Sequence, residues 1–272
     1  MEALEMEKRK VGCIGIGVMG SALMQAVVKV VGPDQVMIFD PDTIKAEAFC
    51  RQTGCVLAPS NREIASDADF VFLAVKPQYL PPVLEEISSS LSSDTIIVSM
   101  AAGVKIEMIR KHLDGHQRII RIMPNTPAAV GCAMIAVAPD ASVSSADVDE
   151  FKRFLSLAGL TEITPEDLMD AVTAVSGSGP AYAYLFIEAL SDAAVKMGMP
   201  RQQAIKYSAQ TLKGAAEMVL QTGTHPAALK DGVCSPAGTT IAGVAKLEEC
   251  GFRTAIIQAS LAAWERSKEL GK

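Results

Sequence analysis

The sequence predicts an α/β protein in two parts: a doubly wound, parallel sheet with flanking helices over residues 1–164, and an all-α region over residues 165–272. Three observations predict this division. Short apolar runs alternate with helix-length segments as far as Thr164, which is typical of strands buried on both faces of a parallel sheet. A glycine-rich turn joins the first run to the first helix, and no comparable run follows Thr164. This alternation favours a doubly wound fold.

Several of the predicted strands are rich in Val and Ile, with little polar alternation. In order, the predicted strands are Val11–Ile16, Gln35–Phe39, Cys55–Leu57, Phe70–Val75, Thr95–Met100, Arg118–Met123, Ala133–Ala138 and Leu160–Thr164. The first helix, Met19–Val31, ends at Gly32-Pro33. The second, Thr43–Gln52, has Asp42 or Thr43 as its N-cap and ends at Gly54.

The second part is expected to be helical and to associate with another copy of itself. Gly and Pro residues separate its helices, which are Ala181–Met197, Arg201–Gln221, Gly238–Cys250 and Phe252–Leu270, and Gly177-Ser178-Gly179-Pro180 interrupts the chain before the first. In Ala181–Met197 the polar residues form a narrow stripe, made of Glu188, Ser191, Asp192 and Lys196. A helix that is apolar around most of its circumference buries more than one face. The sequence therefore predicts a homo-oligomer, at least a dimer.

Composition and charge restrict the class of protein. Hydrophobic residues make up 49% of the chain and charged residues 21%, as in globular proteins and unlike disordered chains. No apolar run approaches the ~18 residues of a membrane span, and Met1–Lys10 lacks the apolar core of a signal peptide. The net charge of −6, without a long basic run, argues against a nucleic-acid partner. The six cysteines have no CxxC spacing and are expected to be reduced thiols in the cytoplasm.

A glycine motif follows the first predicted strand and opens the first helix. Gly15, Gly17 and Gly20 have the GxGxxG spacing of Rossmann-type folds, in which the glycines allow a tight turn, contact with a pyrophosphate, and close helix–strand packing. Asp40 follows Gly20 by 20 residues, at the end of the second strand, where an acid accepts hydrogen bonds from the ribose. This acid favours NAD over NADP. The alternatives are a glycine turn without a ligand, and an Asp40 that only caps a turn with Pro41.

A second segment of interest lies in the helical part. Lys230–Thr240 is rich in small residues and leads into a helix, whose free backbone N–H groups and threonine hydroxyls could hold a carboxylate. The alternative is a plain loop with Thr239 as N-cap. A metal site at His112 and His116 has no further ligands arranged around it, and a nucleophile at Cys234 has no identifiable base. No metal is therefore predicted.

Short stretches along the whole chain occur in an order that is typical of one enzyme family. They are Gly15–Gly20 with Ser21-Ala22, Ala74–Pro77, Ala101–Val104, Met123–Pro127, Ser176–Tyr182, Met199–Arg201, His225-Pro226, Leu229–Asp231 and the signature Ser235-Pro236-Ala237-Gly238-Thr239-Thr240-Ile241. From Gly12 to about Leu270, the sequence resembles the pyrroline-5-carboxylate reductases. The resemblance implies an oxidoreductase of proline biosynthesis that uses NAD(P)H to reduce the cyclic imine 1-pyrroline-5-carboxylate to L-proline, the last step of that pathway.

The resemblance also implies roles for particular residues. Cofactor-binding positions would be Ile14, Gly15, Ile16, Gly17, Val18, Met19 and Gly20 at the pyrophosphate, Asp40 and Asn61 at the adenosine ribose or its phosphate, Ala74, Val75, Lys76, Pro77, Ala101, Ala102 and Gly103 at the nicotinamide half, and Asn125. The substrate carboxylate would bind Ser235, Gly238, Thr239 and Thr240, in a site built with helices of a partner subunit. The sequence departs from the family at Ala237, where a glycine is usual, and at Asp40, where NADPH-preferring members have small or basic residues.

Imine reduction suits the scarcity of acid–base groups. A protonated imine is already electrophilic, so the protein mainly has to position the ring over nicotinamide carbon 4. The Thr240 hydroxyl is the candidate proton donor to the nitrogen, and a water molecule is the alternative. One rival is a β-hydroxyacid dehydrogenase, which shares the GxGxMG loop but needs a lysine just after its second glycine loop, where this chain has none before Lys196. The other rival is a non-catalytic dinucleotide-sensing protein, which the fold alone does not exclude.

Overall fold

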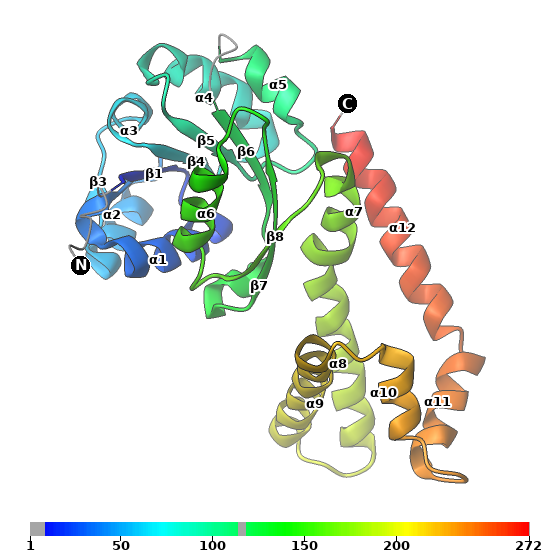
Figure 1. Cartoon of the computed structure of the whole chain (residues 1–272). Coiled ribbons are helices and arrows are strands. Elements are labelled where there is room, and N and C mark those ends of the chain that lie inside the picture. Colours follow the sequence, from blue (N-terminus) through cyan, green and yellow to red (C-terminus); the bar gives the residue numbers. More distant parts are fainter. Residues whose placement is uncertain (1–8, 114–117, 272) are drawn as a thin grey trace, which may run out of the picture. The chain divides into compact units, whose positions relative to one another are not determined.

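The structure, a computed structural model, describes residues 9–113 and 118–271. The chain divides into two compact units, of which unit 1 comprises Met1–Ser178 with Ala263–Lys272 and unit 2 comprises Gly179–Ala262 (Figure 1). Unit 1 contains the sheet and its helices, and unit 2 is helical, so the predicted fold class is confirmed. The first boundary between the two compact units lies after Ser178. This division concerns compact units rather than domains, so the domain boundary expected between residues 164 and 165 stays a prediction.

The predicted strands all form, in a single sheet. They are β1 (Val11–Ile14), β2 (Val36–Phe39), β3 (Val56–Leu57), β4 (Phe70–Leu73), β5 (Ile96–Ser99), β6 (Arg118–Met123), β7 (Ala133–Pro139) and β8 (Gly159–Ile163). Their order in the sheet is β3-β2-β1-β4-β5-β6-β7-β8. The neighbours from β3 to β6 are parallel, so the carboxyl ends of β1, β2, β4 and β5 share one edge. Ligands of doubly wound sheets bind at this edge.

One pair of neighbours differs from the parallel arrangement that the sequence predicts. β7 runs antiparallel to β6, with Ile122 opposite Val137, and β8 is again parallel to β7. The connection between Met123 and Ala133 holds only the short 3-10 helix η4 (Thr126–Val130). A parallel neighbour requires a crossover of a dozen or more residues, so this connection permits only the antiparallel direction.

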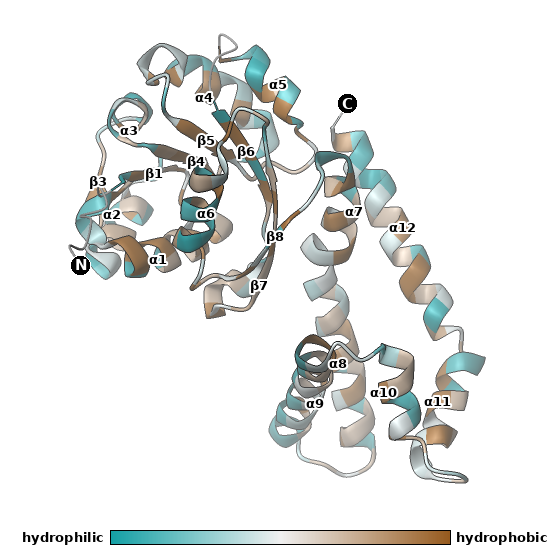
Figure 2. Cartoon of the chain, in the orientation of Figure 1, coloured by the Kyte–Doolittle hydropathy of each residue, from teal (hydrophilic) through white to brown (hydrophobic). Residues whose placement is uncertain are grey.

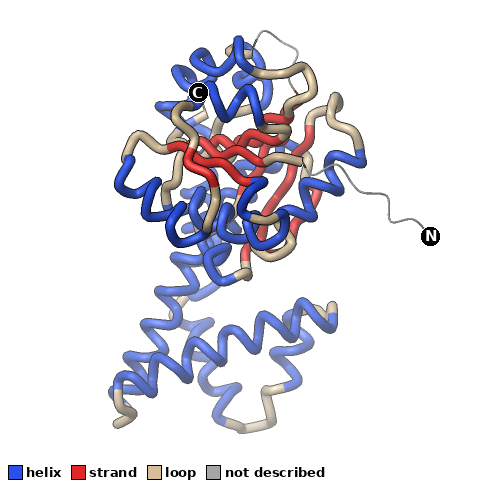
Figure 3. The backbone as a smooth tube through the Cα atoms, turned by 90° about the vertical axis from the view of Figure 1, so that its left-hand side faces the viewer, coloured by secondary structure: helices blue, strands red, loops and turns tan. Residues whose placement is uncertain are grey.

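Helices cover both faces of the sheet, and the strands between them are mostly hydrophobic (Figures 2 and 3). They are α1 (Val18–Val31), α2 (Thr43–Thr53), α3 (Asn61–Asp67), α4 (Leu80–Ile87), α5 (Ile106–Lys111) and α6 (Ser145–Phe154), with 3-10 turns η1 (Pro33–Gln35), η2 (Pro77–Tyr79) and η3 (Ser88–Ser90). On one face Leu23 of α1 and Phe151 of α6 are fully buried against the strands. On the other face Ile64 of α3 and Leu84 of α4 are buried. The two cores hold the sheet rigid beneath the loops at its carboxyl edge.

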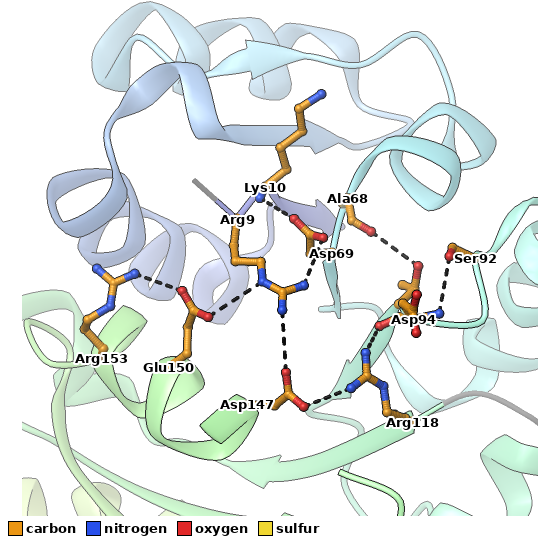
Figure 4. Close-up of polar contacts among 11 residues, drawn as sticks. Arg9, Lys10, Ala68, Asp69, Ser92, Asp94, Arg118, Asp147, Glu150 and Arg153 are labelled. Carbon is orange, nitrogen blue, oxygen red and sulfur yellow. Dashed lines mark hydrogen bonds and ion pairs between the residues drawn. The ribbon is translucent and has the colours of Figure 1, made fainter. Parts of the chain in front are cut away.

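Charged side chains join strands and a helix at the opposite, amino edge of the sheet (Figure 4). Arg9, just before β1, lies 3.2 Å from Asp69 and within ion-pair distance of Asp147 and Glu150 on α6. Arg118, the first residue of β6, donates from Nη1 to Asp147 Oδ2 at 2.8 Å. The network therefore ties α6 to the amino edge, away from the loops that follow β1, β4 and β5.

The helical region agrees with the prediction in most of its elements. The first segment of unit 1 ends with η5 (Glu166–Leu168), α7 (Met169–Val172) and the π-helical turn η6 (Thr173–Gly177). The later helices are α8 (Gly179–Lys196), α9 (Arg201–Thr222), α10 (Pro226–Gly232), α11 (Thr239–Glu249) and α12 (Phe252–Leu270). The four predicted helices correspond to α8, α9, α11 and α12, whereas α10 was not predicted. The break predicted over Gly177–Pro180, before the first of these helices, is shorter in the structure, since only Ser178 separates η6 from α8. Within the described residues, none of these helices has the length and apolar character needed to cross a bilayer.

The last residues of α12 belong to unit 1. Ser267 Oγ donates to Asp170 Oδ1 of α7 at 2.7 Å. A Cβ added at Gly103, in the loop after β5, would lie 2.9 Å from the backbone nitrogen of Gly271. The end of the chain is therefore packed directly against the β5–α5 loop.

Candidate functional site

Two glycines of the GxGxxG motif are required by the packing of unit 1 itself. Gly15 has φ +96°, and a Cβ there would lie 2.8 Å from the carbonyl oxygen of Ala74. A Cβ at Gly20 would lie 2.3 Å from the carbonyl oxygen of Gly15 and 2.9 Å from Ala74 Cβ. Gly15 therefore makes the turn, and Gly20 lets α1 approach the strands, as the motif predicts.

Gly17 is different, because nothing in the fold requires it to be a glycine. Its φ is −66°, and a Cβ there would have no atom within 4 Å. It is the N-cap of α1, and no side chain caps this helix. Free backbone N–H groups and the positive end of the helix dipole favour an anion at such a terminus. The position is therefore open, as the motif predicts for a glycine that a pyrophosphate approaches, and this role stays a prediction.

Asp40 lies directly after β2 and is largely buried. Its Oδ2 accepts a hydrogen bond from the backbone nitrogen of Ile16 at 2.7 Å, and its Oδ1 accepts one from Asp42 N at 3.0 Å. Lys45 Nζ lies 3.5 Å from Oδ2. The carboxylate therefore joins the end of β2 to the glycine loop and also forms the turn at Pro41. The N-cap of α2 is Asp42, which accepts from Lys45 N.

Asn61 is the first residue of α3 and has a buried side chain. Its Nδ2 donates to Glu86 Oε2 at 2.8 Å. Its Oδ1 has no hydrogen-bond partner among the described residues. Buried polar atoms are nearly always paired, so this oxygen fits a donor that arrives with a ligand, such as a ribose hydroxyl.

The other predicted cofactor positions follow neighbouring strands. Ala74–Pro77 comes after β4, and Ala101–Gly103 comes after β5, so both segments lie at the carboxyl edge. Asn125 follows β6, and its amide group already has structural partners: Nδ2 donates to Ser176 and Oδ1 accepts from Met134 N. The glycine loop, Ala74–Pro77, Ala101–Gly103 and Asn125 thus all follow parallel strands at the carboxyl edge, where ligands of doubly wound sheets bind.

The predicted carboxylate segment forms a tight turn before α11. Gly238 N donates to the carbonyl oxygen of Ser235 at 3.0 Å, and a Cβ at Gly238 would lie 2.2 Å from Ser235 Oγ. Gly238 is the N-cap of α11, without a side-chain cap, so the alternative with Thr239 as N-cap is wrong. Thr239 and Thr240 are exposed in the first turn of the helix. Ala237 has φ +58° and is the one residue other than glycine with a positive φ in the described chain.

The remaining candidates have structural surroundings. His225 is the N-cap of α10, where its Nδ1 accepts from Ala227 N. His112 lies 3.2 Å from Glu85, and His116 is outside the described residues. All six cysteines are free thiols. No three His, Cys, Asp or Glu side chains within residues 9–113 and 118–271 are arranged to hold a metal ion.

One partly buried ion pair at the carboxyl edge, with a buried arginine and a half-exposed glutamate, was not predicted. Arg121 of β6 donates from Nη1 to Glu166 Oε1 at 3.2 Å. A charged residue inside the apolar run Arg118–Met123 was the signal that could have drawn attention to it. Its partner could not be found from the sequence, because Glu166 lies 45 residues further along the chain.

Comparison with known proteins identifies one family. The family model for pyrroline-5-carboxylate reductase dimerisation matches residues 166–270, and the model for NADP oxidoreductase, coenzyme F420-dependent, matches residues 10–103. The pyrroline-5-carboxylate reductase of Escherichia coli (strain K12) is 46% identical over 98% of this chain and 100% of its own length. The Methanosarcina acetivorans reductase is 43% identical, with the same coverage. The crystal structure of Plasmodium falciparum pyrroline carboxylate reductase with NADP bound has a TM-score of 0.89 and 33% identity, over 98% of this chain and 100% of that one. The chain belongs to the pyrroline-5-carboxylate reductase family.

Proposed function

We propose that this chain reduces 1-pyrroline-5-carboxylate to L-proline with NAD(P)H, as the last step of proline biosynthesis. The observation that carries the proposal is similarity to reductases of this name over the full length, at 46% identity, in a chain that has an intact glycine loop and an intact Ser235–Thr240 segment. A β-hydroxyacid dehydrogenase would need a lysine early in α8, and Lys196 is the last residue of that helix.

Unit 1 supplies the residues that we assign to the cofactor. The pyrophosphate would lie at Ile14–Gly20, against the uncapped start of α1 and the open position at Gly17. Asp40 and Asn61 would bind the adenosine ribose, and the unpartnered Oδ1 of Asn61 supports this assignment. Ala74–Pro77, Ala101–Gly103 and Asn125 would lie along the nicotinamide half. When bound, the reduced nicotinamide supplies the hydride.

Unit 2 supplies the residues that we assign to the substrate. Ser235, Gly238, Thr239 and Thr240 would hold the carboxylate through backbone N–H groups and hydroxyls at the start of α11. Thr240 is proposed as the catalytic residue, whose hydroxyl donates a hydrogen bond or proton to the imine nitrogen. A Cβ at Gly238 would lie 2.2 Å from Ser235 Oγ, so a larger residue there would displace the Ser235 hydroxyl from its present position.

We also propose that residues 165–272 form the domain through which two copies associate. The similarity to the dimerisation model begins at residue 166, close to this boundary. Unit 2 has an apolar cavity of about 500 Å³, lined mainly by α8 and α12 residues such as Leu185, Phe186 and Ile256. Leu185 is 67% exposed in the single chain, and a partner subunit would bury this apolar side chain. We further propose that the enzyme works in the cytoplasm, where its thiols stay reduced, and that its partners are its substrate and its own copies, without nucleic acid or membrane. The net charge of −6, without a long basic run, argues against nucleic acid.

Assays of the purified chain with each substrate distinguish the proposal from its two rivals. Oxidation of NADH or NADPH on addition of 1-pyrroline-5-carboxylate, with matching formation of proline, is the expected result. Oxidation of β-hydroxy acids with NAD⁺ or NADP⁺ would instead identify a β-hydroxyacid dehydrogenase. Tight cofactor binding without turnover of either substrate would identify a dinucleotide-sensing protein.

A further inference from the structure

Arg121 is a charged residue in a position where the fold needs an apolar one. Its side chain is only 2% exposed, and its neighbours on β6, Ile120 and Ile122, are fully buried. Its Nε and Nη2 have no hydrogen-bond partner among the described residues. Burying an incompletely paired charge is unfavourable, and well-packed apolar residues commonly replace buried ion pairs without loss of stability. Formation of the sheet therefore does not explain this arginine.

The partner of Arg121 makes a second contact that leads to the proposed nicotinamide loop. Glu166 Oε1 accepts from Arg121 Nη1 at 3.2 Å and from the backbone nitrogen of Ile106 at 2.7 Å. Ile106 is the first residue of α5, and its N-cap, Lys105, makes no side-chain capping bond. Glu166 thus takes the place of the missing cap and fixes the point where the loop after β5 becomes helix.

The loop of residues 100–105 is held at its start and middle as well. Ala101 N donates to Ser99 Oγ at 3.4 Å, and Ser99 is the β5 residue that pairs with Arg121 in the sheet. Gly103 has φ +77° and packs against the backbone of Gly271. Three contacts therefore fix the conformation of this loop: Ser99 at its start, Gly271 at Gly103, and Glu166 at Ile106. Glu166 provides the last of them and is paired with Arg121.

We propose that Arg121 and Glu166 are positioning residues for hydride transfer, which set the conformation of loop 100–105 and thereby the place of the nicotinamide ring. This inference rests on the proposed function, in which Ala101–Gly103 line the nicotinamide half. A misplacement of about 1 Å can cost about a hundredfold in rate, because the reacting atoms must be close and aligned. The adenosine half is held by other residues, so loss of the pair impairs the rate while cofactor affinity is kept.

The test compares Glu166→Ala with Glu166→Gln. The alanine variant lacks the acceptor for Ile106 N, whereas the glutamine variant keeps an amide oxygen in the same place. We expect Glu166→Ala to lower kcat by about tenfold to a hundredfold, with an unchanged dissociation constant for NADPH and an increased kinetic isotope effect with 4-deuterated cofactor. Glu166→Gln should restore most of the rate. The fluorescence of the bound reduced nicotinamide should fall in Glu166→Ala, because a less constrained ring is quenched more easily.

Arg118 provides a matched control, because it is an arginine on the same strand that pairs with an acid at the opposite edge of the sheet. Arg118→Met should lower stability but leave kcat, the isotope effect and the bound fluorescence unchanged. Equal losses in Arg118→Met and Glu166→Ala would show a general loss of stability and overturn the proposal, as would a Glu166→Ala protein with wild-type values. A wild-type chain that does not reduce the imine would refute the proposed function instead, and the fluorescence of bound cofactor would still decide the role of the pair.

Discussion

Replacing Ala237 by glycine should stabilise the protein, because this residue is held in the left-handed region. Its φ of +58° costs an L-residue about 1–2 kcal/mol, owing to the proximity of Cβ to the following carbonyl. Glycine removes this strain, but its greater freedom in the unfolded chain opposes the gain by about 0.4–1 kcal/mol. The difference predicts an increase of about 0.8 kcal/mol in the free energy of unfolding.

The assay is urea unfolding of the wild type and the variant at the same subunit concentration, because the stability of an oligomer depends on that concentration. Ala242→Gly is the control, since Ala242 lies five residues further on, inside α11. There the same substitution should destabilise by about 1 kcal/mol, the ordinary cost of glycine in a helix. If Ala237→Gly destabilises as much as Ala242→Gly, Ala237 is not held in the left-handed region and the reasoning is wrong.

Further substitutions test the cofactor and substrate positions, and a labelling experiment tests the cysteines. Gly17→Val should abolish NAD(P)H binding, measured by fluorescence, without unfolding the chain, because a Cβ there meets no protein atom within 4 Å; retained binding would exclude the pyrophosphate from this position. Thr240→Ala should lower kcat by at least about tenfold or raise KM for the imine at unchanged cofactor affinity, with Thr240→Ser partly active; wild-type kinetics in Thr240→Ala would remove its catalytic assignment. The wild type should use NADH at least as efficiently as NADPH, since the Asp40 carboxylate repels a 2′-phosphate, and Asp40→Ser should shift the ratio of kcat/KM toward NADPH by about tenfold; a wild type strongly selective for NADPH would show that Asp40 does not face the ribose. Burial and the neighbouring thiol of Cys55 raise the pKa of Cys50 to about 12, so its reactive thiolate forms only as the pH approaches that value. Iodoacetamide at about pH 8 should therefore modify the exposed Cys132 and Cys250 before Cys50. Faster labelling of Cys50, measured by mass spectrometry of peptides, would contradict this order.

Strands β1, β4 and β5 were predictable because a strand buried on both faces is a continuous apolar run. Strands β3 and β8, at the two edges of the sheet, are largely exposed, so burial on both faces is wrong for them. The predicted ends differ from the observed ones by only a few residues, as at β1, which ends at Ile14 because Gly15 already turns the chain. The glycine loop was equally predictable in Gly15 and Gly20, which the packing requires to be glycines, whereas the fold places no such requirement on Gly17. The direction of β7 could have been inferred from the short connection before it, which is a matter of length rather than of residue pattern.

Other features depend on contacts that no local pattern contains. The helix α10 has only seven residues and begins at Pro226, so it lacks the apolar periodicity by which a longer helix is recognised. The Arg121–Glu166 pair depends on the path of the chain after β8, across a separation of 45 residues. The free oxygen of Asn61 exists because Glu86, on another helix, uses only the amide nitrogen. Pairings of this kind follow from tertiary structure alone.

The final turn of α12 follows unit 2 in the chain and therefore emerges from the ribosome after it. Its contacts with Gly103 and Asp170 can form only after unit 2 has been synthesised, so unit 1, although it contains β1, is closed after unit 2. Unit 2 is in effect an insertion between Ser178 and Ala263, and its helices are complete before the sheet-bearing unit is closed. Removing Ala263–Lys272 would therefore damage the sheet-bearing unit rather than the helices that precede the cut, and a nascent chain released early would leave its β5–α5 loop without support.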